Sequence, residues 1–217
     1  MCSQYALKVE AKTLSEKYNV QIPALLSAID ERFLPYKTAP VIVRTNGFEK
    51  LTPMNFSLVP SWSKEPKVKF ATHNARIETI TEKPTWKIPF KKQHCVVPMT
   101  RFFESVYEGP LAGHIIEFSK ANEDLLFAAG IFDRWNDTEK KDSLFSFSIL
   151  TADPSPFIQS YGHDRCPIFL SYADAVEWLQ INTAEKVMIQ FLMDKKLTPE
   201  LEVKADRPLK AGWEKRR

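Results

Sequence analysis

The chain has 217 residues, 44% of them hydrophobic and 26% charged, with a formal net charge of +3 at pH 7. These values are typical of a soluble globular domain with a sizeable core, and so small a charge does not by itself indicate nucleic-acid binding. Three widely spaced cysteines fit neither a disulfide framework nor a zinc site, and the chain shows neither a secretion signal nor an apolar run approaching ~18 residues, so we expect a cytoplasmic protein.

Apolar runs bounded by turn residues predict a chain dominated by antiparallel strands. The expected strands cover residues 41–43, 48–58, 95–98, 101–107, 114–118, 125–129, 144–151, 168–170 and 201–203. Asn46-Gly47 is a strong signal for the tight turn of a hairpin, so the first two strands should pair. Residues 144–151 alternate large apolar side chains with serines and are the plainest strand pattern in the sequence.

Short helices are expected between the strands, over residues 12–18, 24–29, 84–92, 155–161, 172–180 and 183–193. Pro23 can open the second of these helices, and Ser171 can cap the fifth. No internal repeat, low-complexity tract or linker divides the sequence. We therefore expect a single α+β domain over residues 1–217, with mostly antiparallel strands forming a barrel-like sheet flanked by short helices.

The second residue offers chemistry that no internal cysteine has. If Met1 is removed, Cys2 becomes the N-terminus and carries a thiol and a free α-amine on one Cα. Such a 1,2-aminothiol can condense with an aldehyde and then close a five-membered thiazolidine ring. The alternative is a cysteine of no function in a frayed terminus.

Two internal clusters contain carboxylates, and each has a plain structural alternative. In a strand, Asn74, Arg76 and Glu78 would share one polar face suited to phosphate or sugar contacts. Alternatively, Arg76 and Glu78 simply pair with each other at an exposed edge. Glu104 directly follows two phenylalanines, so burial would raise its pKa and make it a general acid near neutral pH. Alternatively, Glu104 is a surface glutamate.

A third cluster surrounds His163. This histidine could act as an acid or base near neutral pH, with Asp164 or the backbone orienting it and Arg165 holding an anion. A capping or turn role for Gly162-His163-Asp164 is the alternative. The four histidines of the chain have no metal-ligand spacing, so we expect no metal site.

Taken in order, four segments resemble the signature of the SRAP domain family, the SOS-response-associated peptidases, whose members include abasic-site sensors. The segments are Met1-Cys2, Asn74-Ala75-Arg76-x-Glu78-Thr79, Phe102-Phe103-Glu104 and His163-Asp164-Arg165-x-Pro167. Further similarities are Leu58-Val59-Pro60-Ser61-Trp62, Cys95-Val96-Val97-Pro98, Phe127-Ala128-Ala129-Gly130-Ile131 and Ile149-Leu150-Thr151. Each motif is short, but the ordered set covers nearly the whole chain.

The resemblance implies a function. Family members bind single-stranded DNA that contains an abasic site and crosslink to it through the N-terminal cysteine. By position, Cys2 would be the nucleophile. The supporting residues would be Asn74, Glu104 and His163, and the residues lining the DNA groove would be Pro35, Trp62, Arg76, Thr151 and Arg165. The implied protein is a monomer without cofactor, metal or membrane partner, associated with the nucleoid if bacterial.

The chemistry of the residues agrees with this function. An abasic deoxyribose is mostly a closed hemiacetal, and Glu104 or His163 could help to open it to the aldehyde. An α-amine with a pKa near ~7.7–8.0 is partly neutral at physiological pH and can attack that aldehyde. The Cys2 sulfur would then trap the Schiff base in an intramolecular step. Cys95 and Cys166 are expected to be structural.

Two other functions remain open. Cys2 could serve a peptidase, with the Met1–Cys2 bond as its plausible target, or the chain could be a non-catalytic single-strand binding module.

The chain departs from the family pattern at three places. Family members usually begin Met-Cys-Gly-Arg, whereas Ser3-Gln4 follows Cys2 here. Ser105 replaces a common aromatic, and Phe56-Ser57 replaces Trp-Gly. These departures bear on DNA affinity more than on crosslinking.

Overall fold

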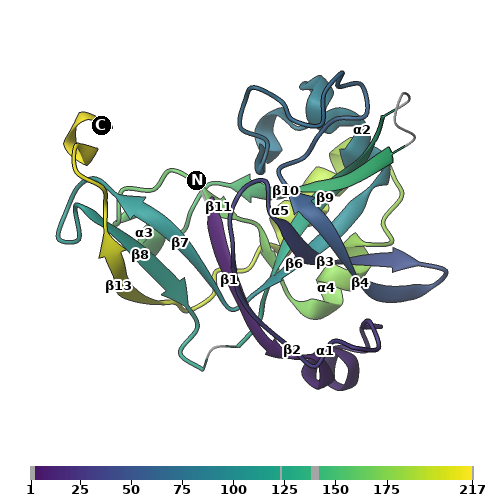
Figure 1. Ribbon diagram of the computed structural model, residues 1–217, viewed down its shortest axis with the longest axis horizontal. Helices are drawn as coiled ribbons and strands as arrows, with labels where there is room; N and C mark the ends of the chain where they lie inside the picture. The colour runs from purple at the N-terminus through teal and green to yellow at the C-terminus, as the bar shows by residue number, and fades with distance from the viewer. Residues whose placement is uncertain (1–2, 123, 138–141, 217) are drawn as a thin grey trace.

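The structure is a computed structural model that describes residues 3–122, 124–137 and 142–216. Met1 and Cys2, the expected reactive end, lie outside the described residues. The described chain forms two β-sheets with short helices around them (Figure 1).

Five strands close into a small barrel. They are β3 (Thr38–Thr45), β4 (Phe48–Phe56), β6 (His94–Met99), β9 (Leu126–Asp137) and β10 (Asp142–Ala152). Neighbours in the ring are antiparallel except β4 and β10, which run parallel, and the pairing of β10 with β9 closes the ring. Three short strands attach to β9 or β10, namely β5 (Asn74–Arg76), β11 (Cys166–Pro167) and β12 (Phe169–Leu170). The expected α+β fold with a barrel-like, mostly antiparallel sheet is confirmed.

A second sheet, antiparallel throughout, lies beside the barrel, at the left of Figure 1. Its strand order is β13 (Glu202–Pro208), β8 (His114–Ser119), β7 (Arg101–Val106), β1 (Gln4–Glu10) and β2 (Ala28–Phe33). Because side chains alternate along a strand, each strand contributes to both faces of the sheet. Tyr5 and Phe102 join the main core, whereas Ala6 and Phe103 form a small second cluster with Ile115 on the opposite face.

The helices are short and sit at the edges of the sheets. They are α1 (Ala11–Tyr18), α2 (Pro84–Lys92), α3 (Pro156–Gln159), α4 (Tyr172–Trp178) and α5 (Glu185–Lys195), with 3-10 turns at Ile77–Thr79 and Trp213–Arg216. The hydroxyl of Ser171 accepts a hydrogen bond from the Asp174 backbone N–H, as the sequence predicts for a helix cap. Within the described ranges, no helix is long and apolar enough to cross a membrane.

The hairpin between β3 and β4 forms as its turn residues predict. Thr45 pairs with Phe48 across Asn46 and Gly47, whose φ angles are 52° and 85°. A two-residue turn of this kind needs positive φ at both central positions, which asparagine and glycine tolerate.

The helix expected over residues 24–29 is wrong. Residues 24 and 25 form a turn, and Ala28 already belongs to β2. This strand pairs with β1 over six residue pairs, from Tyr5↔Phe33 to Glu10↔Ala28. Inter-strand hydrogen bonds available only in the folded protein therefore outweigh the local helix signal of Pro23.

Candidate functional site

Glu104 lies near the end of β7 with its side chain turned toward the main core. Alternation along this strand places Phe102, Glu104 and Val106 on the same buried face. The Glu104 side chain is buried, and this burial raises its pKa to about 7, with the negative charge of Asp164 acting in the same direction. The alternative of a surface glutamate is therefore wrong.

His163 lies directly beside this carboxyl group. Its Nδ1 is 3.9 Å from Glu104 Oε2, and its ring packs edge-on against Phe118 at 6.4 Å between centroids. Burial lowers the pKa of His163 to about 4, while Asp164 opposes that shift. The imidazole is thus neutral at pH 7, and its contact with Glu104 is not an ion pair there. Its Nε2 is buried without a hydrogen-bond partner among the described parts of the chain.

Asn74 and Arg76 belong to β5, which pairs in parallel with β10. Asn74 is buried, whereas Arg76 is exposed and takes part in none of the ion pairs found among the described residues. The strand ends at Arg76, and Glu78 already lies in a 3-10 turn. The expected polar face shared by all three side chains is therefore wrong, because the backbone leaves the extended conformation before Glu78.

Glu78 pairs with Arg165 and not with Arg76. The Arg165 guanidinium donates from Nη1 and Nη2 to the two carboxylate oxygens of Glu78, at 2.9 and 2.7 Å. Nη2 also donates to the Thr151 carbonyl at 2.7 Å, and Nη1 lies 3.3 Å from Asp153 Oδ1. Arg165 is itself buried. These hydrogen bonds tie the loop that carries His163 and Arg165 to β10 and to the 3-10 turn after β5.

Thr151 is fully buried, and its hydroxyl donates to the Ala75 carbonyl at 3.4 Å. This bond links β10 to the strand that carries Asn74. Thr151 therefore helps to hold the strand that carries Asn74 against β10.

Trp62 and Pro35 lie on surface loops. The Trp62 side chain is 54% exposed, and partly exposed Pro35 stands between the exposed side chains of Leu34 and Tyr36. Lys67 Nζ lies 4.5 Å from the centre of the Tyr36 ring, so the loop after β4 touches the turn before β3. Sequence reasoning missed this lysine and tyrosine, although an aromatic residue next to Pro35 was the available signal.

The beginning of β1 lies next to the Glu104–His163 pair. Gln4 is opposite Phe103 in the register of β1 and β7, and Phe103 immediately precedes Glu104. The first described residues therefore bring the N-terminal part of the chain to the buried end of β7.

The two internal cysteines lie inside the protein. Cys95 and Cys166 are both buried, and burial raises the pKa of the Cys95 thiol strongly and that of Cys166 to about 12. Both are protonated thiols at neutral pH and thus poor nucleophiles. Among the residues the structure describes, no three His, Cys, Asp or Glu side chains gather in a group that could hold a metal ion.

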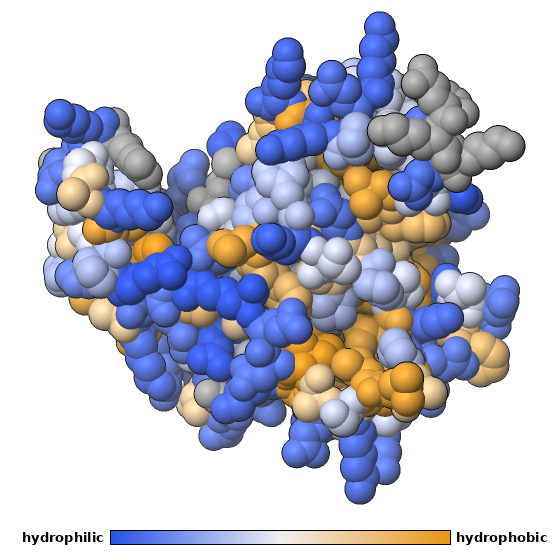
Figure 2. Space-filling model, in the orientation of Figure 1, coloured by the Kyte–Doolittle hydropathy of each residue, from blue (hydrophilic) through white to orange (hydrophobic). Residues whose placement is uncertain are grey.

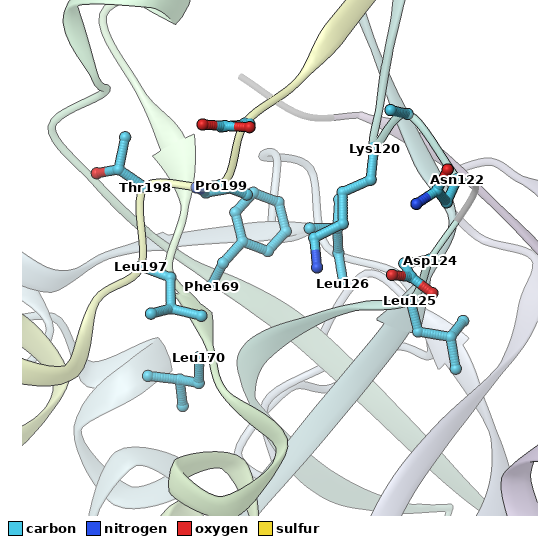
Figure 3. Close-up of a pocket in the computed structure, with 12 residues that line it drawn as sticks. Lys120, Asn122, Asp124, Leu125, Leu126, Phe169, Leu170, Leu197, Thr198 and Pro199 are labelled. Carbon is cyan, nitrogen blue, oxygen red and sulfur yellow. The ribbon is translucent and has the colours of Figure 1, made fainter. Parts of the chain in front are cut away.

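A hollow of about 400 Å³ lies at the start of β9 (Figure 3). Its apolar wall includes Leu126, Phe169 and Leu197, and its polar rim includes Lys120 and Asp124. Neither Glu104 nor His163 lines it. We therefore locate the candidate site at the end of β7, where burial shifts the pKa of two adjacent groups in opposite directions.

The sequence and fold have clear relatives. YoqW of Bacillus subtilis, named an abasic site processing protein, is 26% identical over 205 residues, covering 89% of this chain and 86% of YoqW. YoaM of the same organism, with the same description, is 30% identical over 169 residues, covering 73% and 71%. A crystal structure of a Bacteroides thetaiotaomicron protein superposes with a TM-score of 0.76 at 23% identity, covering 95% of this chain and 92% of the other.

The family match spans almost the whole chain. Residues 1–205 match the family described as SOS response associated peptidase (SRAP). The protein therefore belongs to the SRAP family.

Proposed function

We propose that this protein processes abasic sites, and more specifically that it binds single-stranded DNA and captures the opened abasic sugar through Cys2 as a thiazolidine. The observation that carries the proposal is the buried Glu104–His163 pair next to the beginning of β1. The names of the relatives support the coarser part, because YoqW and YoaM are both described as abasic site processing proteins.

The proposed reaction begins with opening of the sugar. With a pKa of about 7, Glu104 is present at neutral pH in both its acid and its carboxylate form. The acid can donate a proton to the ring oxygen as the C1′ hydroxyl loses one, which yields the aldehyde. His163, neutral at this pH, can hydrogen-bond the sugar hydroxyl or Glu104 without placing a second charge in the buried site.

Capture follows at the N-terminus once Met1 has been removed. The α-amine attacks C1′, water leaves, and a Schiff base forms. The Cys2 sulfur then adds to the same carbon, its proton passes to the nitrogen, and the thiazolidine ring closes. Cys2 precedes Gln4 by two residues, and two residues of extended chain span about 7 Å. Chain length therefore allows the reactive end to reach the Glu104–His163 pair.

The DNA strand is proposed to lie over the loops around this site. Arg76, exposed at the end of β5, would contact a phosphate, and exposed Trp62 would offer a ring for base stacking. Pro35 shapes the turn that meets the Trp62 loop. Arg165 and Thr151 support the groove from below, because their polar groups already bind carboxylates and backbone carbonyls.

Three expectations from the sequence stay proposals. We propose that residues 1–217 act as one domain, that the protein is a monomer working in the cytoplasm, and that the reaction needs no cofactor. Asn74, buried beside β10, is proposed to orient the sugar or the reacting amine.

The test is an adduct assay with single-stranded DNA. Intact mass first establishes that Met1 is absent from the purified protein. Incubation with an abasic oligonucleotide should then give a heat-stable adduct on a denaturing gel, while undamaged DNA and the Cys2→Ala variant should give none. A Met1-free, folded protein that forms no adduct would sink the proposal. Affinity without an adduct would instead favour a binding module, and release of Met1 that depends on Cys2 would favour the peptidase.

A further inference from the structure

The face of the second sheet that points away from the barrel is concave. Arg32 lies on edge strand β2 and Asp206 on the opposite edge strand β13, four inter-strand steps apart. In a flat sheet four steps span about 19 Å. Yet Arg32 Nη1 lies 2.8 Å from Asp206 Oδ2, so the sheet must curl until side chains from its two edges meet.

Gln4 gathers positive charge on this concave face. Its side-chain oxygen accepts hydrogen bonds from Arg32 Nε and Nη2, at 3.2 and 2.8 Å, and from Arg207 Nη2 at 3.5 Å. Asp206 contacts both guanidinium groups, at 2.8 and 3.8 Å. One carboxylate therefore offsets two cations. Figure 2 shows hydrophilic side chains gathered over the area where β13, β8, β7 and β1 lie in Figure 1.

A hollow of about 610 Å³ opens beside this cluster. Its polar lining includes Ser105, Arg207 and Lys210, and Tyr107 and Trp213 contribute two aromatic rings. The rest of the lining is Gln4 and the apolar residues Ile115, Pro208 and Leu209. The rings lie 6.4 Å apart between centroids, with 44° between their planes.

Trp213 is held in place by close contact with a glycine. A Cβ atom at Gly113 would lie 3.0 Å from the Trp213 ring, so only glycine lets the indole approach this closely without displacement. Trp213 lies beyond residues 1–205, the part of the chain that matches the family. The hollow thus depends on a segment that the family match does not include.

The chemistry of the hollow suits one nucleotide. Arginine and lysine attract a phosphate, and aromatic rings stack on a base without regard to its identity. Serine and tyrosine hydroxyl groups can hydrogen-bond a sugar or a base edge. A plain apolar ligand would leave the cations of this hollow unmatched.

The hollow and the candidate active site meet at the end of one strand. Ser105 lines the hollow, and Glu104, its neighbour on β7, points to the opposite face of the sheet. Gln4 also lines the hollow and is opposite Phe103 in the sheet register. A strand of DNA whose abasic sugar reaches Glu104 could therefore pass its next nucleotide around the start of β1.

We infer that this hollow is a subsite for the nucleotide that flanks the abasic sugar on one side. Lys210 and Arg207 bind its phosphate, and Trp213 and Tyr107 stack on its base. The inference rests on the proposed capture of abasic single-stranded DNA and names where part of that substrate binds.

The test measures capture efficiency for three oligonucleotides, one with the abasic site in the middle, one with it at the 5′ end and one with it at the 3′ end. Trp213→Ala should lower capture of the central site about tenfold, because one stacked base is lost. Lys210→Ala should lower it several-fold and reduce the slope of log affinity against log salt by about 0.7, because one phosphate contact is lost. Both variants should equal wild type on the terminal substrate that lacks the relevant flank.

Lys186→Ala is the matched control, because it removes an exposed lysine from α5, away from the hollow. Thermal melting excludes a general loss of folding, and Lys210 is itself exposed. Capture by both variants at the wild-type level on all three substrates would overturn the subsite. An equal defect on all three would also overturn it, since the residues would then act on the reaction or the fold. A wild type that never forms an adduct would instead refute the proposed function.

Discussion

Replacing Glu104 by glutamine tests the proposed mechanism most directly. The substitution keeps the shape of the side chain and removes its acid. If Glu104 must be protonated and the α-amine neutral, the capture rate is proportional to the product of these two fractions. With pKa values of about 7 for Glu104 and ~7.7–8.0 for the amine, the rate should peak between about pH 7 and 8 and fall about tenfold per unit on either side.

The Glu104→Gln variant should lose the alkaline limb of this profile. Its rate should rise with pH until the α-amine is neutral and then stay level, at a maximum about 100-fold or more below that of wild type. Affinity for undamaged single-stranded DNA should stay near wild type. The assay is a single-turnover time course from pH 5.5 to 9.5, with Glu82→Gln, an exposed glutamate, as the matched control.

The same substitution should stabilise the protein at alkaline pH. Burial raises the pKa of Glu104 from an ordinary value of 4.5 to about 7, so the folded state holds a proton that the unfolded state has lost. The stability contributed by the neutral acid is complete below about pH 4.5 and is lost as the pH rises to about 7, by about 3 kcal/mol in total. The free energy of unfolding, measured by chemical denaturation, should therefore favour Glu104→Gln over wild type more strongly at pH 8 than at pH 5.

In the capture assay, equal rates for wild type and Glu104→Gln at every pH would rule Glu104 out as the acid. A parallel collapse of DNA affinity in the variant would make Glu104 a positioning residue.

The remaining predictions concern the thiols, the two arginines and the histidine. Cys95→Ala and Cys166→Ala should keep adduct formation, and a folded variant of either that loses it would move the nucleophile. Arg76→Ala should weaken binding to all single-stranded sequences and lower the salt slope by about 0.7, as read by fluorescence anisotropy at several salt concentrations. Arg165→Ala should lower stability by about 2 kcal/mol, because it removes a buried guanidinium group that binds Glu78 and leaves the buried Thr151 carbonyl without this donor, and unchanged unfolding would contradict that role. His163→Ala should change the rate or reversal of the adduct more than affinity, and an equal loss of affinity would place His163 in DNA binding.

Local patterns predicted most of the strands because their signals were also the ones that decide the fold. The apolar run of β6 and the alternation of serines with large apolar residues in β10 both form strands of the closed barrel, and Asn46-Gly47 forms the turn of its hairpin. The failure at residues 24–29 has a different cause. There the winning interaction is pairing with β1, a partner distant in sequence, which no local pattern reports.

The candidate site divides along the same line. A glutamate after two phenylalanines predicts burial, and Glu104 is buried. The partner of Glu78 was not predictable, because Arg165 is 87 residues away in sequence and meets it through the pairing of both β5 and β11 with β10. The sequence shows that Gln4 stands where family members usually have an arginine. It does not show that Gln4 binds guanidinium groups that come from β2 and β13.

The opposed pKa shifts of Glu104 and His163 explain why the site can hold both groups at low cost. Burying two charges of opposite sign would cost desolvation free energy for each, and at 3.9 Å their attraction does not reliably offset that cost. Here burial instead favours the neutral form of each group, raising one pKa and lowering the other. Near pH 7 the pair therefore carries at most one negative charge, which appears only when the acid gives up its proton. The proposed opening of the hemiacetal would use a proton released near neutral pH, and a permanent ion pair at the same positions would not supply one.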